Sequence, residues 1–157
     1  MEKIPMTTTG FAKVSSELEI LKNKDRPAVI KAISAAREHG DLSENAEYHA
    51  AKDKQGFIEA RILELEYKLS RADVIDVSKI SGNEIKFGAT IRIADDDTDI
   101  NHTFQIVGSD ESDVSRGFLS ITSPLAKAMI GKKVNDFVEV TTPSGYKSYT
   151  ILDIKYQ

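Results

Sequence analysis

The hydrophobic residues of this chain follow two different periods, and the change between them near Asp73 most constrains the fold. Before Asp73, apolar residues recur at heptad spacing, with Gln55 at the one polar position of the seam. These apolar residues are Ala51, Ile58, Ile62, Leu65, Leu69 and Ala72. Charged residues fill the positions between them, which is typical of a helix that packs along a narrow apolar seam. After Asp73 the period becomes two, which is the spacing of β-strands.

The stretch before residue 40 carries a second seam, with apolar residues three and four positions apart. Its members are Phe11, Val14, Leu18, Leu21, Val29, Ile33 and Ala36. Thr8 or Thr9 is a suitable N-cap, Gly40 suits a helix end, and Pro27 predicts a kink or break close by. Two seams joined by a short segment predict an antiparallel helical hairpin. Each arm would have roughly 30 residues and a length of about 45 Å.

The second half of the chain is rich in β-branched and aromatic runs separated by turn-forming clusters. The runs are VIDV, ATIRIA, HTFQIVG, FLSIT, DFVEVTT and SYTILDI. One helix interrupts them, with Ser123 as its N-cap, Pro124 at its first position and Gly131 at its end. The predicted fold class is therefore α+β. A coiled-coil hairpin spans residues 1–76, and a small, mainly antiparallel sheet domain spans residues 78–157.

Composition excludes several classes of site. The chain of 157 residues has no cysteine, which rules out disulfides and thiolate zinc sites, and its three histidines have no metal-ligand spacing. The net charge is −4, and neither half is basic, so any contact with nucleic acid should be local or assisted by a partner. No apolar run is long enough to span a membrane, and MEKIPMTTTG contains no secretory signal. We therefore expect a cytoplasmic protein.

The predicted tip of the hairpin, residues 40–48, reads GDLSENAEY and carries two carboxylates three positions apart. In one interpretation Asp41 is the N-cap of the second helix and Glu44 completes a capping box. In the other, both help to hold Mg²⁺, which carboxylates bind together with waters and phosphate oxygens. Two exposed carboxylates alone would hold the ion weakly, so this second interpretation requires another molecule to supply the remaining ligands and the first ion of a two-metal site.

Arg37 and Lys52 lie on opposite arms at similar distances from the tip. They are either solvated helix charges, as most exposed charges are, or a small basic patch for a phosphate backbone. Tyr48 is interpreted as a residue that packs at the tip.

The segment AREHGDLSENAEYHAAKDKQ, residues 36–55, resembles the coiled-coil tip of the bacterial Gre transcript cleavage and elongation factors. The resemblance continues through VIDV, FGAT, IVG and the segment SPLAKAMIGKK that begins at Ser123, so it covers essentially the whole chain. It is closer to the GreA branch than to the GreB branch, because the arm lacks a large basic surface. Ala126 and Asn135 stand where many relatives have glycine.

This resemblance implies a factor that is not itself an enzyme. Its arm would enter the secondary channel of bacterial RNA polymerase and stimulate the polymerase to cut its own backtracked RNA, which rescues arrested complexes. Asp41 and Glu44 would help to position a second Mg²⁺ and the attacking water, in a site shared with the polymerase and not stable in the free protein. Arg37 and Lys52 would contact the 3′ end of the nascent RNA. The second domain would be FKBP-like and would dock on polymerase around Ser123 and Pro124.

Other classes remain to be compared with this one. A polymerase regulator that blocks the channel without promoting cleavage is the first alternative, and the intact pair Asp41 and Glu44 argues against it. A prolyl isomerase would need an aromatic-lined pocket, and residues 78–157 contain no tryptophan and few aromatics. A coiled-coil scaffold would explain the arm but not the tip. We expect a monomer without membrane contacts.

Overall fold

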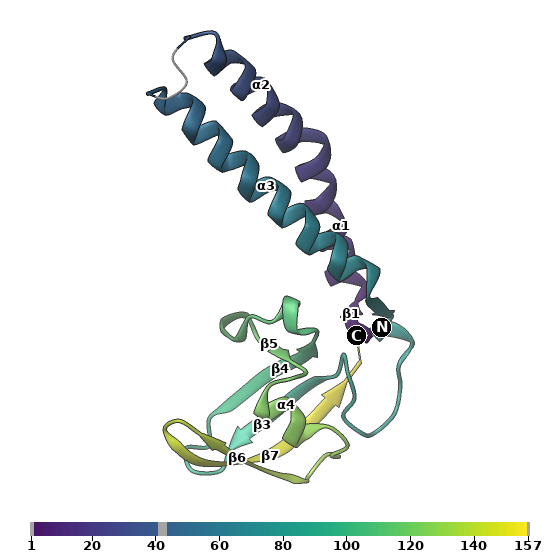
Figure 1. Ribbon diagram of the computed structural model, residues 1–157. Helices are drawn as coiled ribbons and strands as arrows, with labels where there is room; N and C mark the ends of the chain where they lie inside the picture. Colours follow the sequence, from purple (N-terminus) through teal and green to yellow (C-terminus); the bar gives the residue numbers. More distant parts are fainter. Residues whose placement is uncertain (1, 41–43, 157) are drawn as a thin grey trace. The chain divides into compact units, whose positions relative to one another are not determined.

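The computed structural model describes residues 2–40 and 44–156, which form two compact units. One contains residues 11–72 together with the start of the chain, and the other contains residues 4–10 and those from Asp73 onward. The first is a helical hairpin and the second is built around a sheet, which confirms the predicted α+β class (Figure 1). Segment 4–10, which includes the first turn of helix α1, therefore clusters with the second unit, a feature that the hydrophobic pattern did not reveal.

Within the described residues, the hairpin contains three α-helices and one π-helical turn. Their bounds are α1 Thr8–Ile20, η1 Leu21–Asp25, α2 Arg26–Arg37 and α3 Ala46–Ser70. Helices α2 and α3 run side by side in opposite directions (Figure 1). Val29, Ile58 and Ile62 form the buried seam, and Leu18 and Leu21 pack against it. These positions are the ones that the heptad pattern assigned to the seam, because a helix buries residues three and four apart on one face.

Pro27 changes the first arm without ending it. The chain passes through the π-helical turn just before the proline, and the Arg26 backbone N–H donates to the Leu21 carbonyl, five residues back. Such a bulge lets the helix continue past a residue that cannot donate a backbone hydrogen bond. The predicted irregularity is thus present, as a widened turn. The N-cap of the first helix is Thr7 and not the predicted Thr8 or Thr9, because the Thr7 hydroxyl accepts the Gly10 N–H at 3.0 Å.

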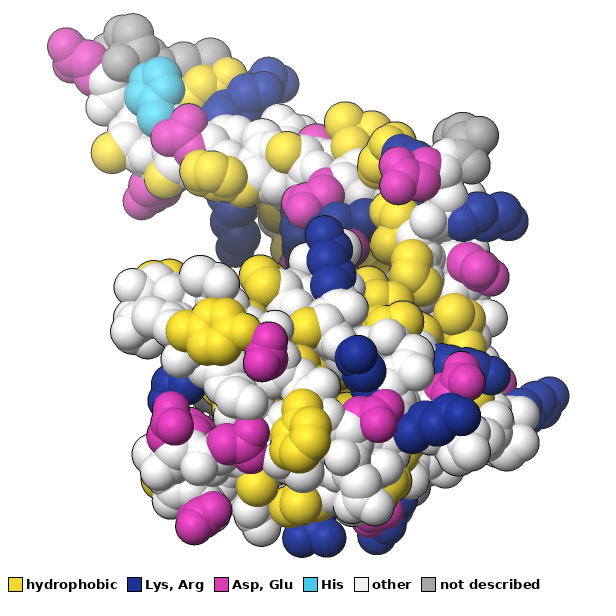
Figure 2. Space-filling model, turned by 90° about the horizontal axis from the view of Figure 1, so that it is seen from below, with side chains coloured by type: hydrophobic (Ala, Val, Ile, Leu, Met, Phe, Trp, Pro, Cys, Tyr) yellow, Lys and Arg dark blue, Asp and Glu magenta, His cyan; other side chains and the backbone are white. Residues whose placement is uncertain are grey.

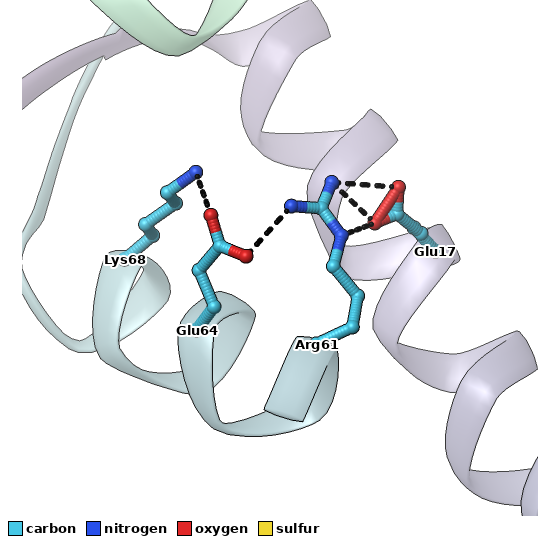
Figure 3. A network of polar contacts seen from close by, with 4 residues as sticks. All are labelled: Glu17, Arg61, Glu64 and Lys68. Atoms are coloured by element: carbon cyan, nitrogen blue, oxygen red, sulfur yellow. Dashed lines mark hydrogen bonds and ion pairs between the residues drawn. The ribbon is translucent and has the colours of Figure 1, made fainter. Parts of the chain in front are cut away.

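Ion pairs join the two arms along the hairpin. Arg61 on α3 reaches across to Glu17 on α1 with N–O distances of 2.8 and 3.0 Å, and also contacts Glu64 at 3.1 Å (Figure 3). Lys68 adds a bond to Glu64 at 3.0 Å. These contacts lower the pKa of Glu64, with the hydrogen bond from Lys68 as the largest cause and the one from Arg61 next. The network aligns the arms, as charged positions beside a coiled-coil seam commonly do.

The second unit contains a five-stranded sheet in the order β5-β4-β3-β7-β6. The bounds are β3 Thr90–Asp95, β4 Asn101–Val107, β5 Phe118–Ser120, β6 Phe137–Thr142 and β7 Gly145–Lys155. Strands β4 and β5 pair in parallel, while the other three pairs are antiparallel, so the sheet is mixed and mainly antiparallel. Short 3₁₀ turns are η2 Val77–Lys79, η3 Ser109–Glu111 and η4 Val114–Arg116. An FKBP-like topology stays a prediction.

One α-helix, α4 Pro124–Met129, packs on this sheet within the described part of the second unit. The core lies between them and is almost entirely aliphatic, with Met129, Ile91, Ile93, Ile106 and Ile151 completely buried. Alternate residues of β3 and β6 point into it, as the period of two predicted.

A small two-stranded sheet pairs β1 Ile4–Thr7 with β2 Ala72–Ile75. Strand β1 was not predicted, because its pairing partner lies far along the chain and its four residues carry no strand pattern of their own. The placement of Ala72 on the heptad seam was wrong, since α3 ends at Ser70 and Ala72 opens β2. No helix within residues 2–40 and 44–156 is long and apolar enough to cross a membrane.

Candidate functional site

The tip of the hairpin connects the end of α2 at Arg37 to the start of α3 at Ala46. Gly40 adopts a φ of +92°, a left-handed conformation that favours glycine, so the chain leaves the first arm as the sequence predicted. Asp41 lies outside the described residues, and Glu44 is described and exposed.

Asn45, and neither predicted acid, caps α3. Its backbone is extended, and its side-chain Oδ1 accepts the Tyr48 N–H at 3.0 Å. The interpretation that places Glu44 at the third helical position of a capping box is therefore wrong, because Glu44 lies before the helix begins. Asparagine caps about as well as aspartate, so the neighbouring Asn45 competes with the D-x-x-E pattern and takes the position. The Glu44 carboxylate is thus not engaged in capping α3.

The same Asn45 side chain also joins the two arms. Its Nδ2 donates to the Ala36 carbonyl at 2.7 Å, across a separation of nine residues. Ala36 is buried in the last turn of α2, and its carbonyl also accepts the His39 N–H at 3.2 Å. One amide therefore caps the start of one helix and adds a second hydrogen bond to a carbonyl at the end of the other.

Acidic groups surround this turn. Glu47 is exposed in the first turn of α3, where negative charge is favourable, and its Oε2 lies 3.5 Å from His39 Nε2. An open hollow of about 420 Å³ is lined by His39, Glu44, Asn45, Ala46 and Glu47. In the space-filling view, a histidine side chain and acidic side chains lie together at the end of the hairpin, with a basic side chain nearby (Figure 2).

The described tip residues fit a shared metal site better than a complete one. Glu44 provides an exposed carboxylate, the kind of ligand that Mg²⁺ takes one or two of, with waters and phosphates filling the rest. Among the described residues no three histidine, aspartate or glutamate side chains cluster closely enough to hold an ion. Any Mg²⁺ held here would need further oxygen ligands from another molecule.

Arg37 and Lys52 are both exposed, each on its own arm. The Arg37 guanidinium lies over the Tyr48 ring, 6.0 Å from its centre, and Lys52 Nζ donates to Gln55 Oε1 at 3.3 Å. Tyr48 also meets His49 edge to face at 5.5 Å. Both basic groups can therefore reach a phosphate, and their contact with RNA stays a prediction.

Ser123 and Pro124 have a structural role of their own. The Ser123 hydroxyl accepts the Ala126 N–H at 3.2 Å and caps α4, and Pro124 occupies the first helical position, as the sequence predicted. Their contact with polymerase is not tested by this structure. Asn135 adopts a φ of +77°, which explains a position that suits glycine, whereas Ala126 is a fully buried helical residue.

Both halves of the chain match models of known families. Residues 4–74 match "Transcription elongation factor, N-terminal", and residues 80–156 match "Transcription elongation factor, GreA/GreB, C-term". A protein named transcription elongation factor GreA from Ruegeria pomeroyi is 61% identical over 156 residues, 99% of each chain. One of the same name from Hyphomonas neptunium is 57% identical over the full length of both chains.

A crystal structure of the GreA factor homolog Gfh1 from Thermus thermophilus is 27% identical and covers 98% of this chain and 99% of its own, with a TM-score of 0.45.

Proposed function

Because this chain belongs to the GreA/GreB family of transcription elongation factors, we propose that it acts on backtracked bacterial RNA polymerase. Its hairpin enters the secondary channel, and its tip stimulates the polymerase to cleave the displaced RNA. Cleavage creates a new 3′ end in the active centre and rescues the arrested complex. The factor itself is not the enzyme, since the first metal ion and the substrate site belong to the polymerase.

One observation carries this proposal most directly. Glu44 is an exposed carboxylate at the tip of a long arm, and Asn45 relieves it of any capping role. Helix α3 alone has 25 residues, so it is about 38 Å long at the usual rise per residue. A narrow arm of that length can carry a carboxylate into a deep active site that a globular domain could not enter.

The chemistry follows from what these residues can hold. A second Mg²⁺, held jointly with the polymerase, would lower the pKa of a bound water and offset charge on the scissile phosphate. Asp41 and Glu44 would supply oxygen ligands for that ion and orient the water. The reaction would be a hydrolysis: the water oxygen would bond to the phosphorus, the bond to the 3′ oxygen would break, and a proton from the water would end on that 3′ oxygen. Arg37 and Lys52 would hold the RNA backbone near its 3′ end.

The second unit would hold the factor on the polymerase surface, with the Ser123–Pro124 region as the proposed contact. We propose a monomer without a membrane partner. The alternative is a regulator that occupies the channel and blocks it without promoting cleavage. The two differ in one outcome, since a blocker binds the stalled complex but leaves the RNA intact.

The test uses polymerase halted in a backtracked position on end-labelled RNA. Addition of the full chain should shorten the labelled RNA many times faster than polymerase alone, and the shortened RNA should extend again when nucleotides are added. Binding without faster cleavage would favour the channel-blocking alternative. Neither binding nor cleavage would exclude polymerase as the partner.

A further inference from the structure

We propose, on the basis of the function above, that Asn45 is the positioning residue of the tip, and that its bond to Ala36 holds the Glu44 carboxylate in place for catalysis. The proposal separates two bonds made by one side chain. The bond from the Tyr48 N–H to Oδ1 starts α3, and the bond from Nδ2 to the Ala36 carbonyl ties α3 to α2.

Only an amide of this length makes both bonds in this arrangement. Capping requires an acceptor, which serine, aspartate and asparagine all provide. The second bond requires a donor that reaches the facing helix, and an ionised aspartate has none while a serine hydroxyl is too short. The capping role alone would therefore leave residue 45 open to several side chains, whereas the tie to Ala36 demands asparagine.

The hydrogen bond from Asn45 to Ala36 lies directly beside Glu44. Glu44 directly precedes Asn45 in the chain, and the Asn45 backbone conformation is fixed between the two bonds. With a length of 2.7 Å, the bond to Ala36 is a short one for an N–H donor, and its acceptor residue is 3% exposed. Without it, α3 would still be capped, but the contacts left between the two helix ends would be those between side chains, His39 with Glu47 and Arg37 with Tyr48.

Precise placement matters for a metal-assisted reaction. Catalytic groups must be held to within about 0.5 Å of their working geometry, and a misplacement of about 1 Å can cost about 100-fold in rate. A looser tip would therefore reduce the maximal cleavage rate more than the affinity for polymerase, since Asn45 is one small residue of a long arm.

Three variants separate the two bonds. Asn45→Ser and Asn45→Asp keep a cap acceptor but lose the donor to Ala36, while Asn45→Ala loses both. Serine adds no charge, so agreement between the first two excludes an effect of the extra carboxylate. Ile62→Val, which trims a buried seam residue away from the tip, serves as a control that weakens the hairpin without touching the turn.

The measurements are the cleavage rate of backtracked complexes at saturating factor, the concentration for half-maximal stimulation, and the melting temperature of each variant. We expect Asn45→Ser and Asn45→Asp to lower the maximal rate about tenfold or more, with an unchanged half-maximal concentration and a smaller loss of melting temperature than Asn45→Ala. Ile62→Val should keep the full maximal rate. Wild-type maximal rates for Asn45→Ser would overturn the proposal, as would an equal rate loss in Ile62→Val. Absence of stimulation by the unsubstituted chain would instead contradict the proposed function.

Discussion

Within the second unit, Glu111 holds the end of strand β1 at Thr7, and replacing it gives a sharp test of the structure. Its Oε2 accepts the Thr7 N–H at 3.1 Å and the Gly108 N–H at 3.0 Å, and its Oε1 accepts a hydrogen bond from the Thr7 hydroxyl. Thr7 is only 6% exposed, and its hydroxyl in turn caps the first turn of α1. Glu111→Ala would leave three donors without their acceptor.

The expected cost follows from these three bonds. A hydrogen bond to a charged group contributes about 1.5–3 kcal/mol, and a buried donor left without a partner costs about 1–3 kcal/mol. The bonds share one carboxylate and are not additive, so we expect a loss of about 3 kcal/mol. Because each 1.4 kcal/mol is tenfold, the Thr7 and Gly108 amides should exchange with deuterium about 100-fold faster.

Hydrogen exchange followed by NMR measures this directly. Glu139→Ala is the matched control, because it also removes a glutamate that accepts a hydrogen bond, at 2.5 Å from the Tyr146 hydroxyl. Tyr146 is 63% exposed, so water can replace the lost acceptor. That substitution should change stability by no more than about 0.5 kcal/mol. Exchange at Thr7 that is unchanged in Glu111→Ala would refute the anchoring role.

Gly10→Ala is expected to change the stability of the protein in opposite directions in the wild-type and the Glu111→Ala backgrounds. A Cβ built at Gly10 would lie 2.1 Å from Glu111 Oε1, and the three nearest atoms all belong to the Glu111 side chain. Gly10→Ala should therefore destabilise the wild-type chain by displacing Glu111 from Thr7. In the Glu111→Ala background the obstruction is gone, and the helix preference for alanine, up to about 1 kcal/mol, should make the same change neutral or stabilising. Equal destabilisation in both backgrounds would contradict this account.

Three further outcomes are expected. The hydrogen bond from Arg26 holds the pKa of Glu59 below its ordinary value. The stability that this ion pair adds is therefore present at pH values above the ordinary pKa, and it is lost as the pH falls through the lowered pKa. Glu59→Gln should make the melting temperature of the hairpin less sensitive to acid. Asn135→Gly should be neutral or stabilising and Asn135→Val should cost about 1–2 kcal/mol in urea unfolding, because φ is +77° there. The double variant Arg37→Ala and Lys52→Ala should reduce crosslinking of the RNA 3′ end to the factor without changing the melting temperature of the factor. Unchanged crosslinking would show that Arg37 and Lys52 are ordinary surface charges without a role in RNA binding.

The hairpin was predictable because its pattern is local and repeated. Val29, Ile58 and Ile62 occupy the seam as their spacing requires, and Pro27 disturbs the helix where its missing donor requires it. Strand β1 was not predictable in the same way, because it forms only when the distant β2 pairs with it. A fragment of residues 78–157 would lack β1 and both Thr7 donors to Glu111, so a division of the chain at that point would remove part of the second unit.

The tip shows how a correct motif can receive a wrong structural interpretation. The spacing of Asp41 and Glu44 fits a capping box, yet Asn45, one residue farther on, supplies the cap and also reaches Ala36. Spacing alone cannot rank adjacent residues of equal capping strength. In the proposed function the remaining ligands of the metal ion would lie on the polymerase, so the ligand roles of Asp41 and Glu44 stay a prediction.

The most direct test of the central claim is transcript cleavage by backtracked polymerase across a Mg²⁺ titration, with Asp41→Asn, Glu44→Gln and the control Glu47→Gln. All three remove one negative charge near the tip, and because Asn45 caps α3, none should change the melting temperature appreciably. The account predicts that the first two lose cleavage stimulation while still binding polymerase, that raised Mg²⁺ partly restores each, and that Glu47→Gln stays active. Wild-type cleavage by the folded Asp41→Asn and Glu44→Gln proteins, or an equal loss in Glu47→Gln, would contradict delivery of a metal ligand by the tip.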